Sequence, residues 1–286
     1  MAFTTLIPAT DLFSRLRDPE VRIFDCRFSL AAPDLKMQEY LQAHIPGSLY
    51  AHLERDLSGP VIPGKTGRHP LPEMDRLTDF FGKNGIDEGV QVVAYDDTGG
   101  AIASARLWWL LRWLGHEAVA VLDGGWQTWL EAGYPVSSGH ESSSTSKFIP
   151  KPRPELIADA QEVWRISVQP AANLFDARSA DRFRGENENI DPVAGHIPGA
   201  RNVPYHNNLD ETGRFRSRDR LRRQYLDLIS ATGSQQVVFY CGSGVTACHD
   251  LLAYYHAGLG EARLYPGSWS EWITSDLRPA AIGEDA

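Results

Sequence analysis

Four short landmarks in the first half of this chain recur, in the same order, in its second half. They pair FDCR (24–27) with FDAR (175–178), AHIPGS (43–48) with GHIPGA (195–200), VVAYDD (92–97) with VVFYCG (237–242), and GGWQTW (124–129) with GSWSEW (267–272). One match of this length would carry little weight, but the shared order of all four indicates an internal duplication. A chain of 286 residues is long enough for two repeats with a core each. We therefore predict two tandem domains of one fold.

The segment between the repeats, SSGHESSSTSKFIPKPRP at residues 137–154, differs in composition from the sequence on either side. Its serines are typical of a flexible linker, and its prolines favour an extended backbone without helix. We therefore expect an N-terminal domain at residues 1–136 and a C-terminal domain at residues 155–286. The first repeat is also the longer one between its HIPG motif and its next strand. The loop SGPVIPGKTGRHPLP (58–72) is the obvious place for the extra residues.

Apolar patterns alternate between strand and helix in both repeats. The segment VRIFD (21–25) is a short predicted strand. The runs at 90–96 and 237–241 are continuously apolar, as expected for strands covered on both faces of a parallel sheet. Helical spacing marks 103–115 and 245–258, and each of these segments ends at a glycine. Alternating strands and helices predict an α/β fold in which each domain is a mostly parallel sheet flanked by helices.

Composition narrows the classes of partner and compartment. The net charge of −9 argues against nucleic acid or an anionic membrane surface as the main partner, although a small anion can still bind a local basic site. No apolar run approaches the ~18 residues that span a bilayer, and the N-terminus does not resemble a signal peptide. The three cysteines form neither a disulfide framework nor a zinc-type pair. We expect a cytoplasmic protein without a metal or membrane partner.

Cys241 stands where an apolar strand meets the loop CGSGVTA (241–247). In parallel α/β sheets, ligands bind at the carboxyl ends of strands. The loop glycines are expected to let backbone amides approach the sulfur, and the following helix adds the positive end of its dipole. Such a site stabilises the thiolate, which is the nucleophilic form of cysteine. The residues expected to surround the sulfur are Gly242, Ser243, Gly244, Val245 and Thr246.

Free cysteines are more often small core residues than nucleophiles. For Cys241 the repeat argues against a core role, because the matching position in the first half is Asp96. A core position is not expected to accept both a cysteine and an aspartate. We therefore expect the Cys241 thiol to be solvent-accessible and reactive. Cys248, on an apolar helical stripe, and Cys26, on an opening strand, are expected to be core residues.

Two chemistries use a cysteine in such a loop. Cysteine-dependent phosphatases place an arginine six residues after the cysteine to bind phosphate bidentately, and this chain has Ala247 there. The other chemistry transfers a sulfur atom through a cysteine persulfide, whose anion the same amides would stabilise. A phosphatase is therefore the less favoured of the two.

The D-x-R, HIPG and GxWxxW landmarks, with an aspartate loop in the first repeat and a cysteine loop in the second, resemble the two-domain rhodanese sulfurtransferases over the whole chain. This resemblance implies an inactive N-terminal domain and a catalytic C-terminal domain. The loop CGSGVTA is similar to that of the 3-mercaptopyruvate branch. The thiosulfate branch typically carries basic residues where this chain has Gly242 and Ser243.

The resemblance thus implies transfer of a sulfur atom from 3-mercaptopyruvate, a small anionic donor, through a persulfide on Cys241. The acceptor would be cyanide, a thiol or a protein, with a thioredoxin-like protein as one candidate, and no cofactor is required. Two alternatives stay open. One is a thiosulfate:cyanide sulfurtransferase, and the other is a non-catalytic persulfide carrier or sensor.

The family also implies particular binding residues. Of its two substrate arginines, the first corresponds to Arg182 in SADRFRG, with Arg184 as a rival. The second should fall in ENENIDPVAGH, which has no arginine; Asp191 stands about there.

The family further implies a histidine and an acid from the N-terminal half that form a relay with Ser243. His69 in GRHPLP matches the histidine, although an exposed turn histidine is an equal alternative. Glu54 is preferred as the acid over Asp56, by its distance from HIPG.

Overall fold

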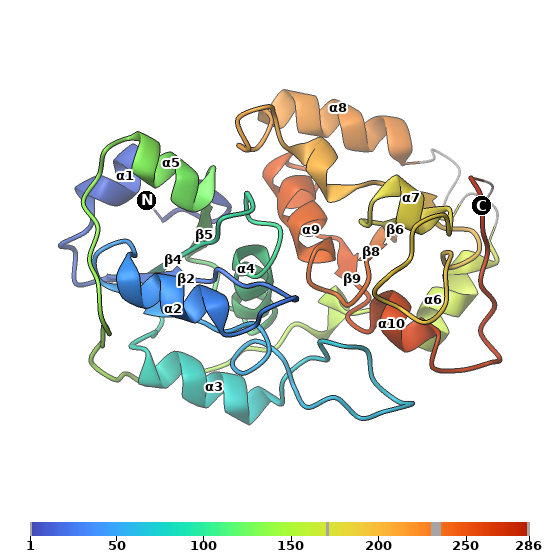
Figure 1. The fold of residues 1–286 in the computed structure, drawn as a ribbon, viewed down its shortest axis with the longest axis horizontal. Helices are drawn as coiled ribbons and strands as arrows, with labels where there is room; N and C mark the ends of the chain where they lie inside the picture. Colours follow the sequence, from blue (N-terminus) through green and yellow to red (C-terminus); the bar gives the residue numbers. More distant parts are fainter. Residues whose placement is uncertain (1, 170–171, 230–235, 285–286) are drawn as a thin grey trace. The chain divides into compact units, whose positions relative to one another are not determined.

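The computed structural model describes residues 2–169, 172–229 and 236–284 (Figure 1). The chain divides into two compact units. Unit 1 comprises Met1–Gly59, Pro72–Arg153 and Asp210–Phe215, and unit 2 comprises Pro60–Leu71, Pro154–Leu209 and Arg216–Ala286. Each half of the sequence therefore contributes one short segment to the unit built mainly by the other half. Among the described residues, no helix is long and apolar enough to cross a membrane.

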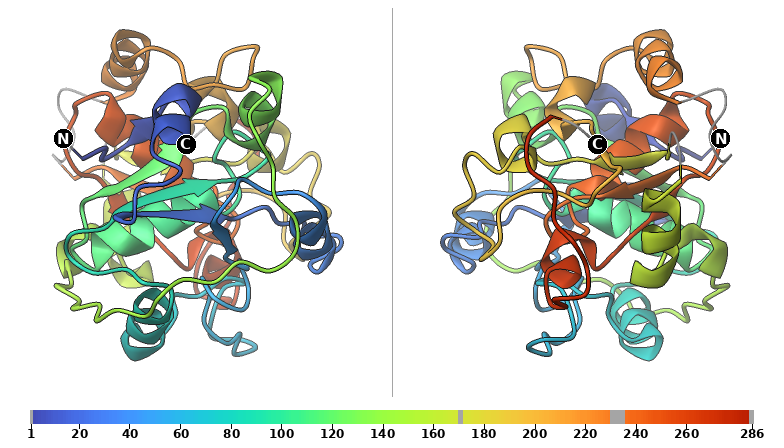
Figure 2. Two further views of the ribbon diagram at one scale, coloured as in Figure 1. Left: turned by 90° about the vertical axis from the view of Figure 1, so that its left-hand side faces the viewer. Right: turned by 90° about the vertical axis from the view of Figure 1, so that its right-hand side faces the viewer.

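Unit 1 contains a five-stranded, fully parallel sheet in the order β1-β5-β4-β2-β3. Its strands are β1 (Leu6–Ile7), β2 (Val21–Asp25), β3 (Ser48–Tyr50), β4 (Gln91–Tyr95) and β5 (Val119–Leu122). Its helices are α1 (Ala9–Ser14), α2 (Leu35–Gln42), α3 (Met74–Lys83), α4 (Ser104–Trp113) and α5 (Gly125–Glu131). In the left view of Figure 2, α1 and α5 lie above the strands and α3 lies below them. Every residue of β4 is buried, as its continuous apolar pattern predicts.

In the residues that the structure describes, unit 2 contains a four-stranded parallel sheet in the order β7-β6-β8-β9. Its strands are β6 (Leu174–Asp176), β7 (Arg201–Asn202), β8 (Val238–Tyr240) and β9 (Arg263–Leu264). Its α-helices are α6 (Ala160–Ser167), α7 (Ala180–Phe183), α8 (Arg218–Leu228), α9 (Ala247–His256) and α10 (Ser268–Trp272). The described part of unit 2 also contains two short 3₁₀ helices, η1 (Pro154–Leu156) and η2 (Tyr205–Asn208).

The strand order of unit 2 repeats that of unit 1 without its β1, and a parallel bridge from Ile157 to Leu264 takes the place of that strand. The predicted duplication and the predicted α/β fold are therefore both confirmed.

The repeated D-x-R motif forms the same arginine–aspartate ion pair in both units. Arg27 binds Asp25, and Arg178 binds Asp176, each through a guanidinium–carboxylate pair at 2.6 Å. All four side chains are almost fully buried, so each pair fixes the turn that follows its strand. The D-x-R motif recurs in both halves because it has this structural role in each unit.

The segment 137–154 has no α-helix or strand, as its prolines predict. Its backbone is nevertheless hydrogen-bonded to other residues of unit 1. The amide of Ser146 donates to the carbonyl of Gly82 at 2.9 Å, and that of Lys151 donates to Leu114 at 2.8 Å. Most of the segment is therefore part of unit 1, and the domain boundaries drawn from the sequence stay a prediction.

Candidate active site

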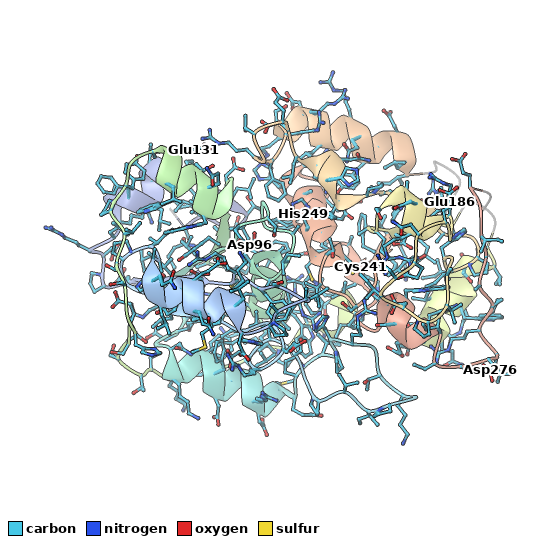
Figure 3. The ribbon with its side chains drawn as sticks, viewed as in Figure 1. Asp96, Glu131, Glu186, Cys241, His249 and Asp276 are labelled. Atoms are coloured by element: carbon cyan, nitrogen blue, oxygen red, sulfur yellow. The ribbon has the colours of Figure 1, made fainter. Side chains whose placement is uncertain are left out.

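Cys241 lies directly after β8, at the start of the loop that leads into α9 (Figure 3). Its side chain is only 1% exposed, so the prediction of a solvent-accessible thiol is wrong. The cause is the first turn of α10, which closes over the loop. The amide of Trp269 donates to the carbonyl of Cys241 at 3.0 Å, and the amide of Ser270 donates to the carbonyl of Gly242 at 2.9 Å. Asp96, at the matching position of unit 1, is buried as well.

Ser268 is a site residue that the sequence analysis missed. Its hydroxyl oxygen accepts the amide N–H of Cys241 at 3.1 Å, and its own hydrogen goes to the carbonyl of Tyr265. Ser268 has φ 54°, the one left-handed non-glycine residue of the described chain. The matching residue of the first repeat is Gly125, with φ 57°. Comparison of the two repeats could have found it, because serine replaces a glycine that the turn favours.

The two loop glycines serve different purposes. Gly244 has φ 75°, and a side chain there would collide with the carbonyl oxygen of Pro266. Gly242 is not in the left-handed region. Its Cβ would instead stand 2.9 Å from the Nη2 atom of Arg68 and 3.6 Å from the Nη1 atom of Arg182. Gly242 thus leaves room for two guanidinium groups beside Cys241.

The segment 60–71, which makes up most of the predicted extra loop (58–72) of the first repeat, forms part of unit 2. Gly67 packs against the carbonyl of Gly267, and the amide of Arg68 donates to the Ser270 hydroxyl at 3.1 Å. These contacts hold the next residue, His69, with its Nδ1 atom 2.7 Å from the Oγ atom of Ser243. Both His69 and Ser243 are buried, so the alternative of an exposed turn histidine is wrong.

Arg182 and Arg68 meet at one carboxylate. Arg182 binds Asp191 at 3.0 Å through Nη2, and Arg68 binds the other oxygen of Asp191 through Nη1. Arg68 is the second residue that the sequence analysis missed. No arginine stands where the family resemblance implies one, but a guanidinium reaches this place from the loop next to His69. The signal was the adjacency of Arg68 to His69 in a loop of unusual length.

Each of these arginines has one Nη atom that is not bound to Asp191 or Glu188. Arg182 uses Nε and Nη2 on Glu188 and Asp191, whereas its Nη1 has no acceptor among the described residues. Arg68 uses Nη1 on Asp191, and its Nη2 likewise has no acceptor in the described part of the chain. Both of these unpaired Nη atoms lie beside Gly242, as does the paired Nη2 atom of Arg182, at 3.7 Å from the position of a Cβ there. They form a place for an anion next to Cys241.

Two buried carboxylates shape the charge around these arginines. Glu188 accepts from Arg182 and from the amides of Ile190 and Asp191; burial raises its pKa, but these hydrogen bonds outweigh burial and hold the pKa below its usual value. Burial raises the pKa of Asp191, and the neighbouring Arg68 offsets only part of that rise. The rival Arg184 binds Glu186 and Glu284 instead, and so faces other partners.

Unit 1 shows what the repeated loop can hold. The carboxylate of Asp96 accepts hydrogen bonds from the hydroxyls of Thr98 and Ser104. It also accepts from five backbone amides, those of Thr98, Gly100, Ile102, Ala103 and Ser104. An anion at this position is thus surrounded by donors of its own loop. The matching loop of unit 2 places a sulfur there.

The other residues singled out from the sequence are Val245, Thr246, Glu54, Cys248 and Cys26. Val245 is buried, and Thr246 is half-buried at the start of α9. Glu54 is an exposed residue of unit 1, where its amide donates to the ring of His52, and its place in a relay stays a prediction. Cys248 and Cys26 are buried, which confirms their assignment to the core. Among the described residues, no cluster of potential metal ligands occurs.

Comparison with known proteins tests the resemblance. The family model of the rhodanese-like domain matches residues 8–132 and again residues 159–275. The chain belongs to the rhodanese family. Both predicted copies of the domain are therefore confirmed, and the loop that carries Cys241 lies in the second match.

Relatives along the full length bear names of two kinds. A Pseudomonas aeruginosa protein, named a probable 3-mercaptopyruvate sulfurtransferase, is 46% identical over 285 residues, which cover 99% of this chain and 100% of that protein. A Mycobacterium tuberculosis protein, SseB, named a candidate thiosulfate sulfurtransferase, is 40% identical over 283 residues and 97% of both chains. SseA from Escherichia coli, described among 3-mercaptopyruvate sulfotransferases, has a similar structure with a TM-score of 0.81 and 32% identity over 94% of this chain and 100% of its own.

Proposed function

We propose that this chain is a sulfurtransferase that takes a sulfur atom from 3-mercaptopyruvate onto Cys241 and passes it to a thiol, to cyanide or to a protein acceptor. Membership of the rhodanese family supports sulfur transfer. The relatives from Pseudomonas aeruginosa and Escherichia coli with 3-mercaptopyruvate names favour this donor over thiosulfate. The proposed chemistry requires no organic cofactor or metal.

One observation carries the proposal. The unpaired Nη atoms of Arg68 and Arg182 flank Gly242, and Gly242 follows Cys241, which itself directly follows strand β8. A guanidinium pair suits a carboxylate, and 3-mercaptopyruvate carries its carboxylate and keto group next to its sulfur-bearing carbon. A donor bound by this pair would present its sulfur to the Cys241 thiolate.

The transfer is a double displacement through a covalent intermediate. The Cys241 thiolate attacks the donor sulfur, and a sulfur–sulfur bond forms. The carbon–sulfur bond of the donor breaks, its electron pair stays on carbon as the enolate of pyruvate, and a proton completes pyruvate. A thiolate acceptor then attacks the outer sulfur of the persulfide, and Cys241 leaves as the thiolate. His69 and Ser243 supply the hydrogen-bonded pair that can move the proton in the first half-reaction.

The acceptor and the compartment belong to the same proposal. A thioredoxin-like protein is one thiol that could accept the sulfur. A cytoplasmic location suits the chemistry because a reducing compartment keeps the nucleophilic thiol free, and none of the three cysteines forms a disulfide bond.

The test begins with the donor alone. Incubation of the protein with 3-mercaptopyruvate should add the mass of one sulfur atom, and cyanide should remove it with release of thiocyanate. Cys241→Ser should lose both reactions and keep its fold by circular dichroism, whereas Cys248→Ser should retain the persulfide. Comparable transfer by the Cys241→Ser variant would overturn the proposal. Steady-state rates with 3-mercaptopyruvate and with thiosulfate in parallel distinguish the two donors, and a persulfide that forms without turnover would indicate a carrier.

A further inference from the structure

The arginine pair beside Cys241 is bridged by an acid that a simple anion site does not need. Asp191 gives one carboxylate oxygen to Arg68 and the other to Arg182. Its side chain is 2% exposed, as is that of Glu188, which binds Arg182 from the other side. Two guanidinium groups are thus held by two buried carboxylates.

This arrangement sets the net charge at the donor site. The charges of Arg68 and Arg182 are balanced by those of Asp191 and Glu188, while Arg178 is paired with Asp176 close by and also lies 3.4 Å from Glu188. The site therefore offers directed N–H donors with little net positive charge. Such a site can hydrogen-bond one carboxylate, but it cannot neutralise a second negative charge, and it holds that charge close to the Asp191 carboxylate.

We propose that Asp191 is a specificity-determining residue that makes this site select donors with a single negative charge, such as 2-oxo carboxylate thiols, over dianionic donors such as thiosulfate. This inference rests on the proposed function. Asp191 acts through Arg68 and Arg182 and does not touch the reacting sulfur, so it is a positioning residue as well. It orients each guanidinium so that one Nη atom faces Gly242.

The same contacts explain why an acid stands where the family resemblance implies an arginine. Arg68 brings the missing positive charge from the segment 60–71, and Asp191 anchors it. The site keeps two guanidinium groups but gains one buried negative charge. Its preference for monoanions should therefore exceed that of a site with two arginines and no bridging acid.

Asp191→Asn tests the inference because asparagine keeps the size of the side chain and one acceptor but removes the charge. The matched control is Glu186→Gln, which removes one negative charge from an exposed residue of the same segment that binds Arg184 (Figure 3). We expect the ratio of kcat/KM for thiosulfate to kcat/KM for 3-mercaptopyruvate to rise by about tenfold or more in Asp191→Asn, and to stay within about twofold in Glu186→Gln. An unchanged or lower ratio in Asp191→Asn would overturn the inference.

A measurement on the unaltered protein covers the case in which Asp191→Asn does not fold. At constant ionic strength, pyruvate, a monoanion, should inhibit persulfide formation more strongly than sulfate, a dianion. Equal or stronger inhibition by sulfate would also contradict the role of Asp191 in selecting monoanions. Failure of the proposed function gives a different result, because neither donor would then place sulfur on Cys241 of the unaltered protein.

Discussion

His69 and Ser243 lie 174 positions apart in the sequence, yet the Nδ1 atom of His69 is 2.7 Å from the hydroxyl oxygen of Ser243. Both side chains are buried in unit 2, and Ser243 is two residues from Cys241. A hydroxyl bound to an imidazole can pass a proton toward a group beside the cysteine. The pair therefore links the extra loop of the first repeat to the chemistry of the second.

We expect His69→Gln and Ser243→Ala each to lower kcat by roughly 10²-fold or more, in the range of general acid–base contributions. Because the two groups act as one pair, the double variant should be little worse than either single one. Stopped-flow measurement of pyruvate release with 3-mercaptopyruvate isolates the first half-reaction. Multiplicative losses in the double variant would show that the two residues act independently.

Glu54 and Asp56 are rival candidates for the acid of the relay, and their surroundings separate them. Glu54 is exposed, whereas the Asp56 carboxylate accepts the amide of His52 at 2.8 Å. Because Glu54 is the acid of the proposed relay, Glu54→Gln should lower kcat, and the exposure of Glu54 predicts only a small change in melting temperature. Asp56→Asn should instead lower the melting temperature, because its native hydrogen bond is weakened. A normal kcat in Glu54→Gln would remove Glu54 from the relay.

The sequence patterns were sufficient for the fold because the repeat, the apolar strands and the helix-ending glycines are all local signals. They also identified Arg182, His69 and Ser243 as site residues that the structure brings close to Cys241. Arg68 and Ser268 were missed for different physical reasons. Arg68 reaches its place through a long-range docking of segment 60–71, which no local pattern encodes. The burial of Cys241 depends in the same way on α10, which follows more than twenty residues later.

Ser268 combines strain with a useful hydrogen bond, and two substitutions separate these effects. Ser268→Ala keeps the left-handed φ and leaves the buried amide of Cys241 without its acceptor. Ser268→Gly loses the same acceptor but relieves the strain, which should make it more stable than Ser268→Ala by about 1 kcal/mol. Denaturant unfolding of both variants measures the difference. Equal stabilities would mean that the φ of 54° carries no cost.

Asp96 should be one of the most sensitive positions in unit 1. Asp96→Ala leaves several buried amides without an acceptor, and we expect a loss of at least about 3 kcal/mol of unfolding free energy. The neighbouring Asp97 is the control, since it makes a partly exposed ion pair with Lys36 at 2.8 Å. Asp97→Ala should cost no more than about 1 kcal/mol in the same denaturant titration. A small effect at Asp96 would contradict the anion-holding role of its loop.

Asp250 on α9 makes the stability of the protein dependent on pH. It is fully buried, with one carboxylate oxygen bound by Tyr225 at 3.1 Å and also by Asn208. Burial raises its pKa from 3.8 to about 8, against the lowering effect of these hydrogen bonds. The native state therefore keeps a proton on Asp250 at pH values where the unfolded chain has lost it.

The sign of the effect follows from that difference. Stability from Asp250 is fully present below pH 3.8 and is lost as the pH rises toward about 8, with a slope of at most about 1.4 kcal/mol per pH unit. Asp250→Asn removes this titration, while the amide keeps the shape of the protonated acid. We expect the variant to gain stability relative to the unaltered protein from pH 5 to pH 8, measured as the difference between their unfolding free energies. Other groups that titrate in this range cancel in that difference, so parallel curves for the two proteins would show that Asp250 is ionised in the native state.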